Sequence, residues 1–160
     1  MPSTEISPGL VVQRLPAAQR LSDYQLIAFD MDSTLINIEC IDEIADAAGR
    51  KAEVAAITEA AMQGVITDFK DSLRQRVAML RGVPVAHLQT VLQERLRLNP
   101  GAQNLMIAAR EAGLKTLLVS GGFTFFAERV KEALGMDFAR ANQLEVADGL
   151  LTGKLIDQCW

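Results

Sequence analysis

The order of hydrophobic patterns along the chain is the feature that most limits its fold. An apolar, strand-like run over residues 25–29 is followed by four successive helical patterns with no strand pattern between them. From residue 101 onward, strand and helix patterns alternate. Because consecutive helices pack mainly on one another whereas alternating strands and helices build a parallel sheet, the four helices are predicted to be an insertion in an α/β domain.

Glycine and proline residues mark the limits of the four helical patterns, since both residues commonly end or open a helix. These residues are Gly49, Gly64, Gly82, Pro84 and Gly101. Between them, apolar side chains recur at helical spacing and give each helix one face to bury. The insertion is therefore expected to form an antiparallel four-helix cap.

The sequence on either side of the cap predicts an α/β core. After the insertion we expect a helix over 102–112, a buried strand over 114–119, a helix over 123–134, and a β-hairpin over 144–155. Asp148-Gly149 is typical of the tight turn of such a hairpin. The predicted division is a lead-in over 1–24 containing a short strand at Val11-Val12, a core over 25–38 and 101–160, and a cap over 39–100.

Composition excludes several classes of protein. The chain has 160 residues, of which 49% are hydrophobic and 22% charged, which suits a globular domain with one core. The net charge of −4 and the scattered basic residues argue against nucleic-acid binding. No apolar run is long enough to span a membrane, and the first residues lack the pattern of a signal peptide, so a cytoplasmic protein is expected.

The cysteines and the single histidine do not form a metal-binding pattern. Cys40, Cys159 and His87 are too few for a structural zinc site, and a disulfide is not expected in a reducing compartment. Cys40 lies in an apolar helical pattern, which favours a buried thiol over a reactive one. His87 is expected at the surface.

Two carboxylates follow the first strand directly. Asp30 and Asp32 are two residues apart, so on an extended chain they project to one side and could share a cation or divide a nucleophilic and an acid/base role. The alternative is a strand that ends in a turn, because aspartate and serine both favour turns. The two interpretations are equally supported by these residues alone.

A second candidate site is Ser120-Gly121-Gly122, between a predicted strand and a predicted helix. A hydroxyl and backbone N–H groups at a helix N-terminus attract anions, and glycines let the backbone approach a phosphate closely. An ordinary strand-to-helix connection is the alternative. The position favours a site, since ligands of open α/β sheets bind at the carboxyl ends of parallel strands.

Together the two segments indicate phosphoryl transfer. A carboxylate can attack phosphorus to give an acyl phosphate, and a neighbouring acid can serve the leaving group. Asp30 would repel a phosphate dianion, so a hard, oxygen-ligated cation such as Mg²⁺ is expected between them.

Several segments resemble the haloacid dehalogenase superfamily. Asp30-Met31-Asp32-Ser33-Thr34 matches its motif Asp-x-Asp-x-Thr. Within the superfamily, the closest resemblance is to the phosphoserine phosphatase branch. It covers about residues 25–155 and rests on four segments in the same order: 29–42, 72–77, 119–123 and 148–153. The resemblance implies a Rossmann-like α/β core with an inserted cap, and Mg²⁺-dependent hydrolysis of O-phosphoserine, the last step of serine biosynthesis.

The resemblance also implies roles for the residues of the first motif and of Ser120-Gly121-Gly122, which we call the glycine cradle. Asp30 would be the nucleophile, and Asp32 the acid that protonates the leaving oxygen and then the base that activates water. Mg²⁺ would be held by the Asp30 carboxylate and the Asp32 carbonyl. Ser120 and Gly121 would bind the phosphate.

The substrate's amino-acid end has its own candidates by the same resemblance. Glu39 would bind the ammonium and Arg76 the carboxylate, while Met62 and Phe69 would close over the substrate. The residues alone leave other roles open: Glu39 could complement a helix dipole, Arg76 could form an internal ion pair or extend to solvent, and the two apolar side chains could belong to the core.

Arg76 is also unusual in its helical pattern. At 100° per residue, Phe69, Leu73 and Leu80 fall at about 0°, 40° and 20°, and Arg76 falls at about −20°, within the apolar stripe. Arg74 points well away from this stripe. An inward-facing guanidinium needs an anion, and a carboxylate ligand fits that need.

Two motifs of the family do not occur before Trp160: a lysine and the acidic sequence Gly-Asp-Gly-x-Asn-Asp. Lys154 lies within the predicted hairpin and is not a convincing counterpart of the lysine. The resemblance thus implies a truncated form with an incomplete sheet, an unpaired apolar edge at residues 26–29 and little activity on its own.

Two other functions stay open at this point. One is a related phosphatase or phosphotransferase acting on another small phosphate ester. The other is a catalytically dead fragment that binds phosphate or an amino acid. A response-regulator receiver is set aside because its acidic pair occurs earlier in the chain and it has no helical insertion.

Overall fold

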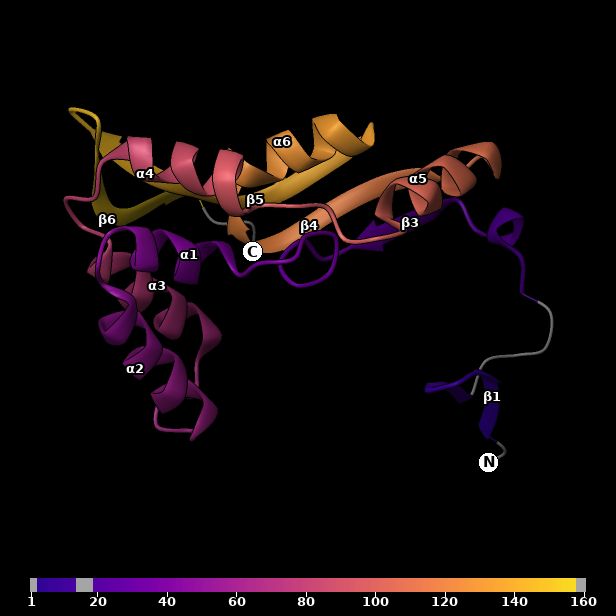
Figure 1. Ribbon diagram of the computed structural model, residues 1–160, viewed down its shortest axis with the longest axis horizontal. Coiled ribbons are helices and arrows are strands. Elements are labelled where there is room, and N and C mark those ends of the chain that lie inside the picture. Colours follow the sequence, from indigo (N-terminus) through magenta and orange to yellow (C-terminus); the bar gives the residue numbers. More distant parts are fainter. Residues whose placement is uncertain (1–2, 14–18, 158–160) are drawn as a thin grey trace.

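The computed structural model describes residues 3–13 and 19–157 and has a four-stranded mixed sheet at its centre (Figure 1). The strand order is β3-β4-β5-β6, in which β3–β4 and β4–β5 are parallel and β5–β6 is antiparallel. The bounds are Leu26–Phe29 for β3, Lys115–Phe123 for β4, Phe138–Ala147 for β5 and Leu150–Asp157 for β6. The predicted α/β fold with a C-terminal hairpin is confirmed.

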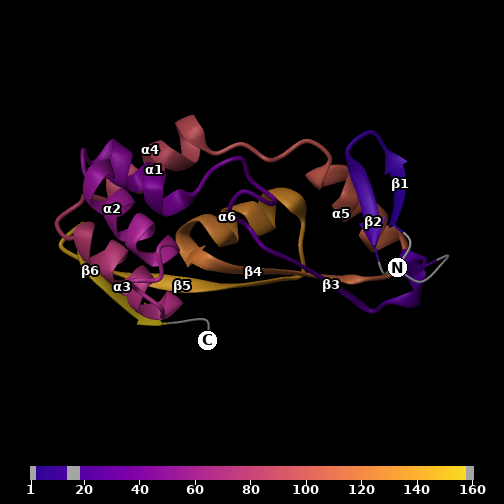
Figure 2. The same ribbon diagram turned by 90° about the horizontal axis from the view of Figure 1, so that it is seen from below.

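The predicted helical insertion lies between β3 and the next core helix. It contains α1 (Cys40–Ala47), α2 (Lys51–Met62), α3 (Phe69–Met79), α4 (Val85–Thr90) and a π-helical turn, η2 (Val91–Arg95). The core helices are α5 (Ala102–Glu111) and α6 (Thr124–Leu134). In Figures 1 and 2, α1, α2 and α3 gather at one end of the sheet while α5 lies towards the other.

The N-terminal segment contributes small elements. β1 (Ser3–Ser7) and β2 (Leu10–Gln13) pair antiparallel with each other, so the short strand expected at Val11-Val12 is present. A 3-10 turn, η1 (Leu21–Asp23), precedes β3. No helix in residues 3–13 and 19–157 combines the length and the hydropathy that crossing a bilayer requires.

The fourth helix of the insertion differs from the continuous helix expected. After α4 the chain forms a π turn, in which the Leu96 N–H donates to the Val91 carbonyl five residues earlier at 3.0 Å. A π turn holds one more residue than an α turn, so it rotates the side chains that follow. Apolar spacing did not reveal it, because Leu88 and Val91 are buried as an uninterrupted helix would place them.

Two strands are longer than expected. β4 continues through Ser120-Gly121-Gly122 to Phe123, and its pairing with β5 shifts register between Val119 and Phe123. The glycine cradle is thus an irregular strand end, and the helix begins at Thr124. β5 starts at Phe138 rather than near residue 144, since small and polar residues such as buried Ala139 and Asn142 hid its alternation.

One hydrophobic core runs from the sheet into the insertion. Its largest fully buried side chains include Phe123, Phe126, Met31 and Ile44. Burying a side chain of this size contributes roughly 1.5–3 kcal/mol, so residues from the sheet, the core helix and the cap stabilise one another. The shared core holds the cap against the carboxyl ends of β3 and β4.

The predictions for the cysteines and histidine have separate outcomes. Cys40 is fully buried, and burial raises the pKa of its thiol, as expected of an inert buried cysteine. His87 is half-buried, and its Nδ1 is buried without a hydrogen-bond partner, so the expected surface position is wrong for that atom. Cys159 lies outside the described residues.

The two chain segments that connect cap and core are tied to each other. The Asn99 side-chain amide donates to the carbonyls of Thr34 and Ile36 at 2.9 and 3.0 Å. Asn37 and Arg97 exchange two hydrogen bonds, at 3.1 and 2.7 Å. Since these hydrogen bonds join the two segments, the chain enters and leaves the cap at one place.

The cap also pairs with the outer edge of the hairpin. Gly82 and Val85 donate backbone hydrogen bonds to Leu151 and Gly149 at 2.7 and 2.9 Å, and Leu151 donates to Val83 at 2.8 Å. The segment between α3 and α4 therefore extends the sheet beyond β6. Paired in this way, β6 does not present a free edge along these residues.

The opposite edge and one face of the sheet are open in the described part of the chain. β3 is a terminal strand there, with no further strand beyond it. α5 and α6 both pack on β4, whereas Leu26, Val119 and Phe138, on the other face, are 41–49% exposed. Parallel sheets are usually covered on both faces. The expected apolar edge at residues 26–29 is thus present.

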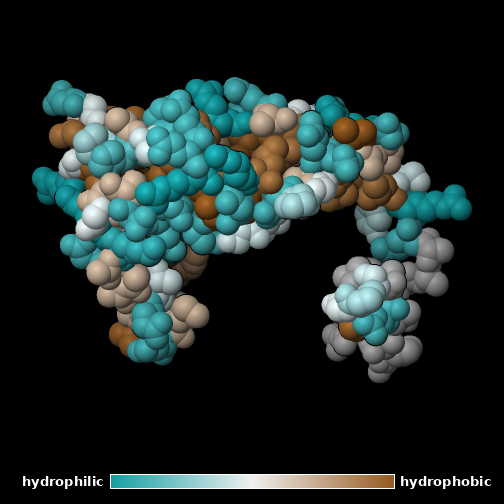
Figure 3. All heavy atoms as spheres, in the orientation of Figure 1, coloured by the Kyte–Doolittle hydropathy of each residue, from teal (hydrophilic) through white to brown (hydrophobic). Residues whose placement is uncertain are grey.

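Side chains of different polarity cover different parts of the surface. Figure 3 shows hydrophilic side chains over α1 and α4 and hydrophobic ones around α5. Leu105 and Ile107 of α5 are 40% and 41% exposed, in agreement with this view. On this face, the surface over α1 and α4 is thus more polar than the surface around α5.

Candidate active site

The parallel pairing of β3 and β4 brings the two predicted segments together at one edge of the sheet. Asp30 and Asp32 follow β3, and Ser120-Gly121-Gly122 form the end of β4. They line a single cavity of about 190 Å³. Its full lining is Asp30, Asp32, Glu39, Ile41, Phe69, Leu73, Arg76, Ser120, Gly121, Gly122 and Phe123.

A compact loop after β3 positions the two aspartates. The carbonyl of Met31 accepts hydrogen bonds from the N–H groups of Leu35 and Ile36 at 2.9 and 3.1 Å, which folds the chain back on itself. The Met31 side chain is fully buried and anchors the loop in the core. Asp30 Oδ1 accepts a hydrogen bond from the Met31 N–H at 2.7 Å, while the Asp30 residue as a whole is exposed to the cavity.

Asp32 occupies the more enclosed position of the pair. Its Oδ2 accepts a hydrogen bond from the Cys40 N–H at 3.4 Å, and its Oδ1 is buried without a partner. Burial raises the pKa of Asp32 to about 6, and the negative charges of Glu39 and Asp30 add to the rise, while the hydrogen bonds of Cys40 oppose it. Asp32 can therefore hold or release a proton near neutral pH, as an acid/base group must.

Glu39 immediately precedes α1 and lines the cavity. It is the N-cap of α1, and its side chain makes no capping bond to the helix. Glu39 Oε1 instead accepts a hydrogen bond from Ser33 Oγ at 2.6 Å. Ser33 has a φ of 53°, a left-handed conformation that costs a residue other than glycine about 1 kcal/mol or more and often occurs at functional sites.

The glycine cradle is in close contact with the carboxylate loop. The Gly122 N–H donates to Ser120 Oγ at 2.9 Å. A Cβ atom on Gly122 would lie 3.0 Å from Ser120 Oγ and 3.1 Å from Asp32 Oδ2, so only glycine leaves these polar atoms their space. Ser120 is almost fully buried at the floor of the cavity.

Asn142 supports this cradle from the neighbouring strand. Its side chain is fully buried and donates to the Gly121 carbonyl at 2.8 Å. We did not identify it from the sequence. The available signal is an asparagine inside a strand, where asparagine is uncommon unless its amide has partners.

Helix α3 supplies the cap side of the cavity. Phe69, Leu73 and Arg76 lie on its inward face, as helical spacing indicated. The Phe69 ring lies so close to the cradle that a Cβ on Gly121 would be 3.1 Å from it. Arg76 is half-buried, and its Nε donates weakly to the Ser72 carbonyl at 3.5 Å, which leaves the guanidinium at the cavity.

Met62 lies outside the cavity that the other candidates line. It is 80% exposed and does not line the cavity with Asp30. It borders a neighbouring hollow of about 320 Å³ that also includes Phe69 and Arg76. Seven of the eight predicted site residues thus meet in one cavity, and their roles stay predictions.

Known proteins similar in sequence have one description in common. A model of the haloacid dehalogenase-like hydrolase family matches residues 27–159. A phosphoserine phosphatase of a Polaromonas species is 67% identical over 160 residues, which are 100% of this chain and 68% of the relative. A phosphoserine phosphatase of Idiomarina loihiensis is 59% identical over 131 residues, which are 82% of this chain and 59% of the relative.

Solved structures agree with the sequence relatives. A phospho-aspartyl intermediate analogue of phosphoserine phosphatase has a TM-score of 0.75 and 43% identity, covering 82% of this chain and 62% of that one. A substrate-bound phosphoserine phosphatase has a TM-score of 0.75 and 42% identity, covering 82% and 61%. The chain thus spans 68% of the Polaromonas relative and between 59% and 62% of the other three proteins named here.

Proposed function

This chain belongs to the haloacid dehalogenase-like hydrolase family, and we propose that its site hydrolyses O-phosphoserine to serine and phosphate. The observation that carries the proposal is the distribution of charge in one cavity. A carboxylate pair and a phosphate cradle lie together with Glu39 and Arg76, which have opposite charges. A zwitterionic amino-acid phosphate has the three charged groups that this arrangement complements.

Each end of the substrate has a partner in this proposal. The Ser120 hydroxyl and the Gly121 N–H bind the phosphate, with Asn142 fixing the Gly121 peptide by its 2.8 Å hydrogen bond. Glu39, held by Ser33, binds the ammonium, and Arg76 binds the carboxylate as a bidentate pair. The Phe69 ring covers the cradle and excludes water from the bound ester.

Hydrolysis takes place in two steps that use Asp30 and Asp32. An Asp30 oxygen attacks phosphorus, the bond from phosphorus to the serine oxygen breaks, and Asp32 gives its proton to that oxygen. Asp32, now a carboxylate, takes a proton from water as the water oxygen attacks phosphorus. The bond from phosphorus to Asp30 then breaks, phosphate leaves and both groups return to their initial states. The pKa of about 6 at Asp32 suits both directions of proton transfer.

The donors at the cavity fit Mg²⁺. Asp30 faces the cavity and the Asp32 backbone carbonyl lies in the same loop, so both can ligate a hard cation while water and substrate oxygens complete the shell. Among the described residues, no cluster of three or more His, Cys, Asp or Glu side chains is placed to hold a metal. When bound, the cation neutralises charge between Asp30 and the phosphate.

We further propose that this chain alone turns over slowly. Among the described residues, the lining of the cavity offers one cationic side chain, Arg76, and no lysine. A nucleophilic carboxylate and a phosphate dianion repel each other strongly where the dielectric is low. A bound cation would offset part of that repulsion, but Arg76 is assigned to the substrate's carboxylate, which leaves no cationic side chain of this lining for the phosphate.

The test compares the purified chain with its Asp30→Asn variant. Isothermal calorimetry with 5 mM Mg²⁺ measures binding of L-phosphoserine, phosphoethanolamine and phenyl phosphate, and phosphate release measures hydrolysis. We expect phosphoserine to bind most tightly and phosphoethanolamine, which lacks the carboxylate, to bind about tenfold more weakly. Equal binding of all three ligands would contradict the proposed substrate, and activity retained by Asp30→Asn would contradict the proposed nucleophile.

A further inference from the structure

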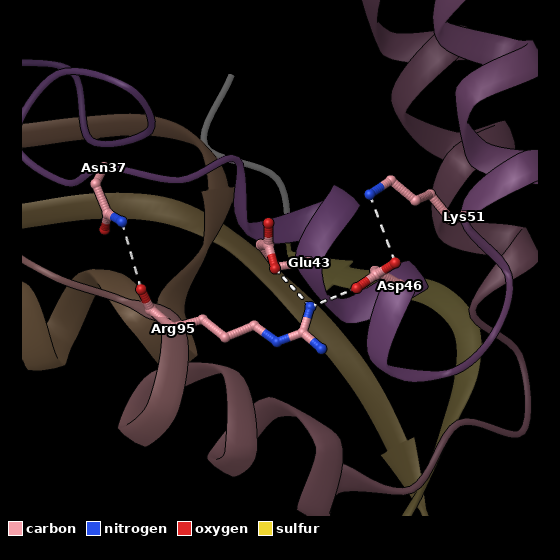
Figure 4. A network of polar contacts seen from close by, with 5 residues as sticks. All are labelled: Asn37, Glu43, Asp46, Lys51 and Arg95. Carbon is pink, nitrogen blue, oxygen red and sulfur yellow. Dashed lines mark hydrogen bonds and ion pairs between the residues drawn. The ribbon is translucent and has the colours of Figure 1, made fainter.

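Arg95 connects α1 to the segment that leaves the cap. Its Nη1 donates to Glu43 Oε2 at 2.6 Å and to Asp46 Oδ2 at 2.7 Å, as Figure 4 shows. Glu43 and Asp46 are three residues apart and therefore share one face of α1. The Arg95 side chain is 32% exposed, so the ion pairs are only partly screened by solvent.

The backbone of Arg95 holds the segment that leads into the cap. The Arg95 carbonyl accepts a hydrogen bond from the Asn37 side-chain amide at 3.4 Å (Figure 4). Arg95 is the last residue of the π turn η2, and the extra residue of that turn determines the direction from which its side chain approaches α1. Arg95 thus contacts both the segment that leads into the cap and the first cap helix.

The position of α1 matters because its N-cap is Glu39. Glu43 lies in the first turn of α1, four residues after Glu39. The Glu43 N–H donates to the Glu39 carbonyl at 3.1 Å, so the two residues share one helical turn. Only Glu39 lines the cavity, whereas the Glu43 carboxylate is bound by Arg95. Without Arg95, Glu43 would carry an unpaired negative charge one helical turn from Glu39.

We propose that Arg95 is a positioning residue for recognition of the substrate's ammonium group: by binding Glu43 and Asp46 it fixes α1 and leaves Glu39 as the carboxylate that faces the ammonium. Arg95 does not itself line the cavity, so it acts through α1. The inference rests on the proposed function, because it assigns Arg95 a role in selecting an amino-acid phosphate.

The test measures a preference between two ligands on the same protein preparation. L-Phosphoserine and phenyl phosphate share the phosphate group, but only phosphoserine has an ammonium. For Arg95→Gln, we expect the preference for phosphoserine, measured by calorimetry with Mg²⁺, to fall about fivefold while phenyl phosphate binds as before. Since the ratio is taken within one preparation, a smaller folded fraction affects both ligands equally.

Control variants separate positioning from stability. Arg129→Gln removes an exposed ion pair with Glu132 on α6, far from Glu39 in sequence, and should leave the preference unchanged. Glu43→Gln added to Arg95→Gln removes the competing carboxylate and should restore most of the preference. Arg95→Met keeps the aliphatic stem and serves for the same measurement if Arg95→Gln does not fold.

The possible outcomes distinguish the inference from the proposed function. A wild-type preference that persists in the folded Arg95 variants overturns the inference and leaves the proposed function intact. Equal weakening of both ligands also overturns it, because a structural defect would then explain the loss. A wild-type chain with no preference for phosphoserine contradicts the proposed function and the inference together.

Discussion

Asp32 is held in a position that lowers stability at neutral pH. Its folded pKa of about 6 is raised above the ordinary value, so the folded state disfavours the charged form. Folding is therefore most favourable for this group below about pH 4, and the advantage is lost as pH rises through 6. Asp32 Oδ1 is also buried without a hydrogen-bond partner. Unfavourable positions of this kind are typical of functional sites.

Asp32→Asn should therefore stabilise the chain while abolishing hydrolysis. In the absence of divalent cations, we expect its free energy of unfolding at pH 7.5 to exceed that of the wild type by an amount on the order of 2 kcal/mol, with little difference at pH 4. Urea unfolding at the two pH values in EDTA measures this. A variant that is less stable than the wild type at both values would show that burial does not penalise the charge.

The two glycines of the cradle should differ in their tolerance of a methyl group. In Gly122→Ala the new Cβ would meet Asp32 Oδ2 and Ser120 Oγ, both of which are confined, so we expect phosphate binding to weaken at least tenfold. In Gly121→Ala the Cβ would meet only the edge of the exposed Phe69 ring, which can move, and the loss should be smaller. Calorimetry with inorganic phosphate compares the variants, and equal losses would contradict the contacts described.

At the scale of elements, packing between α3 and β6 depends on one residue without a side chain. Gly153 of β6 has a φ of +81°, and a Cβ there would lie 3.0 Å from the Arg81 Cβ and 3.2 Å from the Ala78 carbonyl oxygen. Gly149, in the hairpin turn, has a similar φ of +75°, but a Cβ there would have no atom within 4 Å. Comparing the two glycines therefore separates the cost of a strained backbone from the cost of a packing clash.

Gly153→Ala should cost more stability than Gly149→Ala. Both variants place alanine in a left-handed conformation, at about 1–2 kcal/mol. Gly153→Ala additionally pushes α3 away from β6, and overpacking of this kind typically costs a further 1–3 kcal/mol. Chemical unfolding at pH 7.5 measures both values. Equal losses would mean that α3 moves aside freely.

The connection from α6 to β5 depends on one carboxylate. Asp137 accepts hydrogen bonds from Lys115 Nζ at 2.8 Å and from the Thr116 N–H and hydroxyl at 2.9 and 3.0 Å. The Lys115 ammonium, followed by the Thr116 N–H, lowers the pKa of Asp137 to about 2. Its contribution to stability is therefore complete above about pH 4 and is lost as pH falls towards 2.

Asp137→Asn should reduce the dependence of stability on pH in this window. We expect the variant to be less stable than the wild type at pH 7 and the difference to shrink between pH 4 and pH 2, as followed by thermal unfolding. Asp71→Asn is the matched control, because the Asp71 carboxylate pairs with Arg74 at 3.4 Å on an exposed surface. A difference between Asp137→Asn and the wild type that stays constant with pH would exclude this role.

The elements that were predicted correctly are those whose signal lies in neighbouring residues: a regular spacing of apolar side chains or a pair of turn residues. The apolar faces of α1 and α3 and the Asp-Gly hairpin turn are local signals, and each appears in the structure where expected. The π turn η2 and the extension of β4 through two glycines were not predicted, because both depend on tertiary contacts that override local preference.

The same distinction applies to the site. Asp30, Asp32 and Ser120 follow predicted strands, so the topology of a parallel sheet was sufficient to place them together. Asn142 and Ser33 act on other site residues by hydrogen bonds, at 2.8 Å to Gly121 and 2.6 Å to Glu39. Such supporting contacts join distant or strained positions and have no spacing that a sequence pattern could reveal.

At the scale of the whole molecule, cap and sheet are joined on three sides. Asn37 and Asn99 join the two chain segments that connect cap and core. The hydrophobic core is shared by cap and sheet, and the segment 82–85 pairs with β6. The opposite end of the sheet has no such cover in the described residues, since β3 is a terminal strand and Leu26 is 49% exposed. Cohesion of the fold is therefore concentrated at the cap end.

This asymmetry predicts self-association through the β3 end of the sheet. An exposed apolar edge strand offers unpaired backbone groups and hydrophobic area to a second molecule, and a charge placed on it is the usual protection. We expect the wild-type chain to form larger species at micromolar concentration and Leu26→Glu to shift the onset of association to several-fold higher concentration, as followed by light scattering. Val65→Glu, at a residue 74% exposed in the turn between α2 and α3, adds the same charge away from β3 and should not have this effect. If both variants delay association equally, net charge rather than the β3 edge controls it.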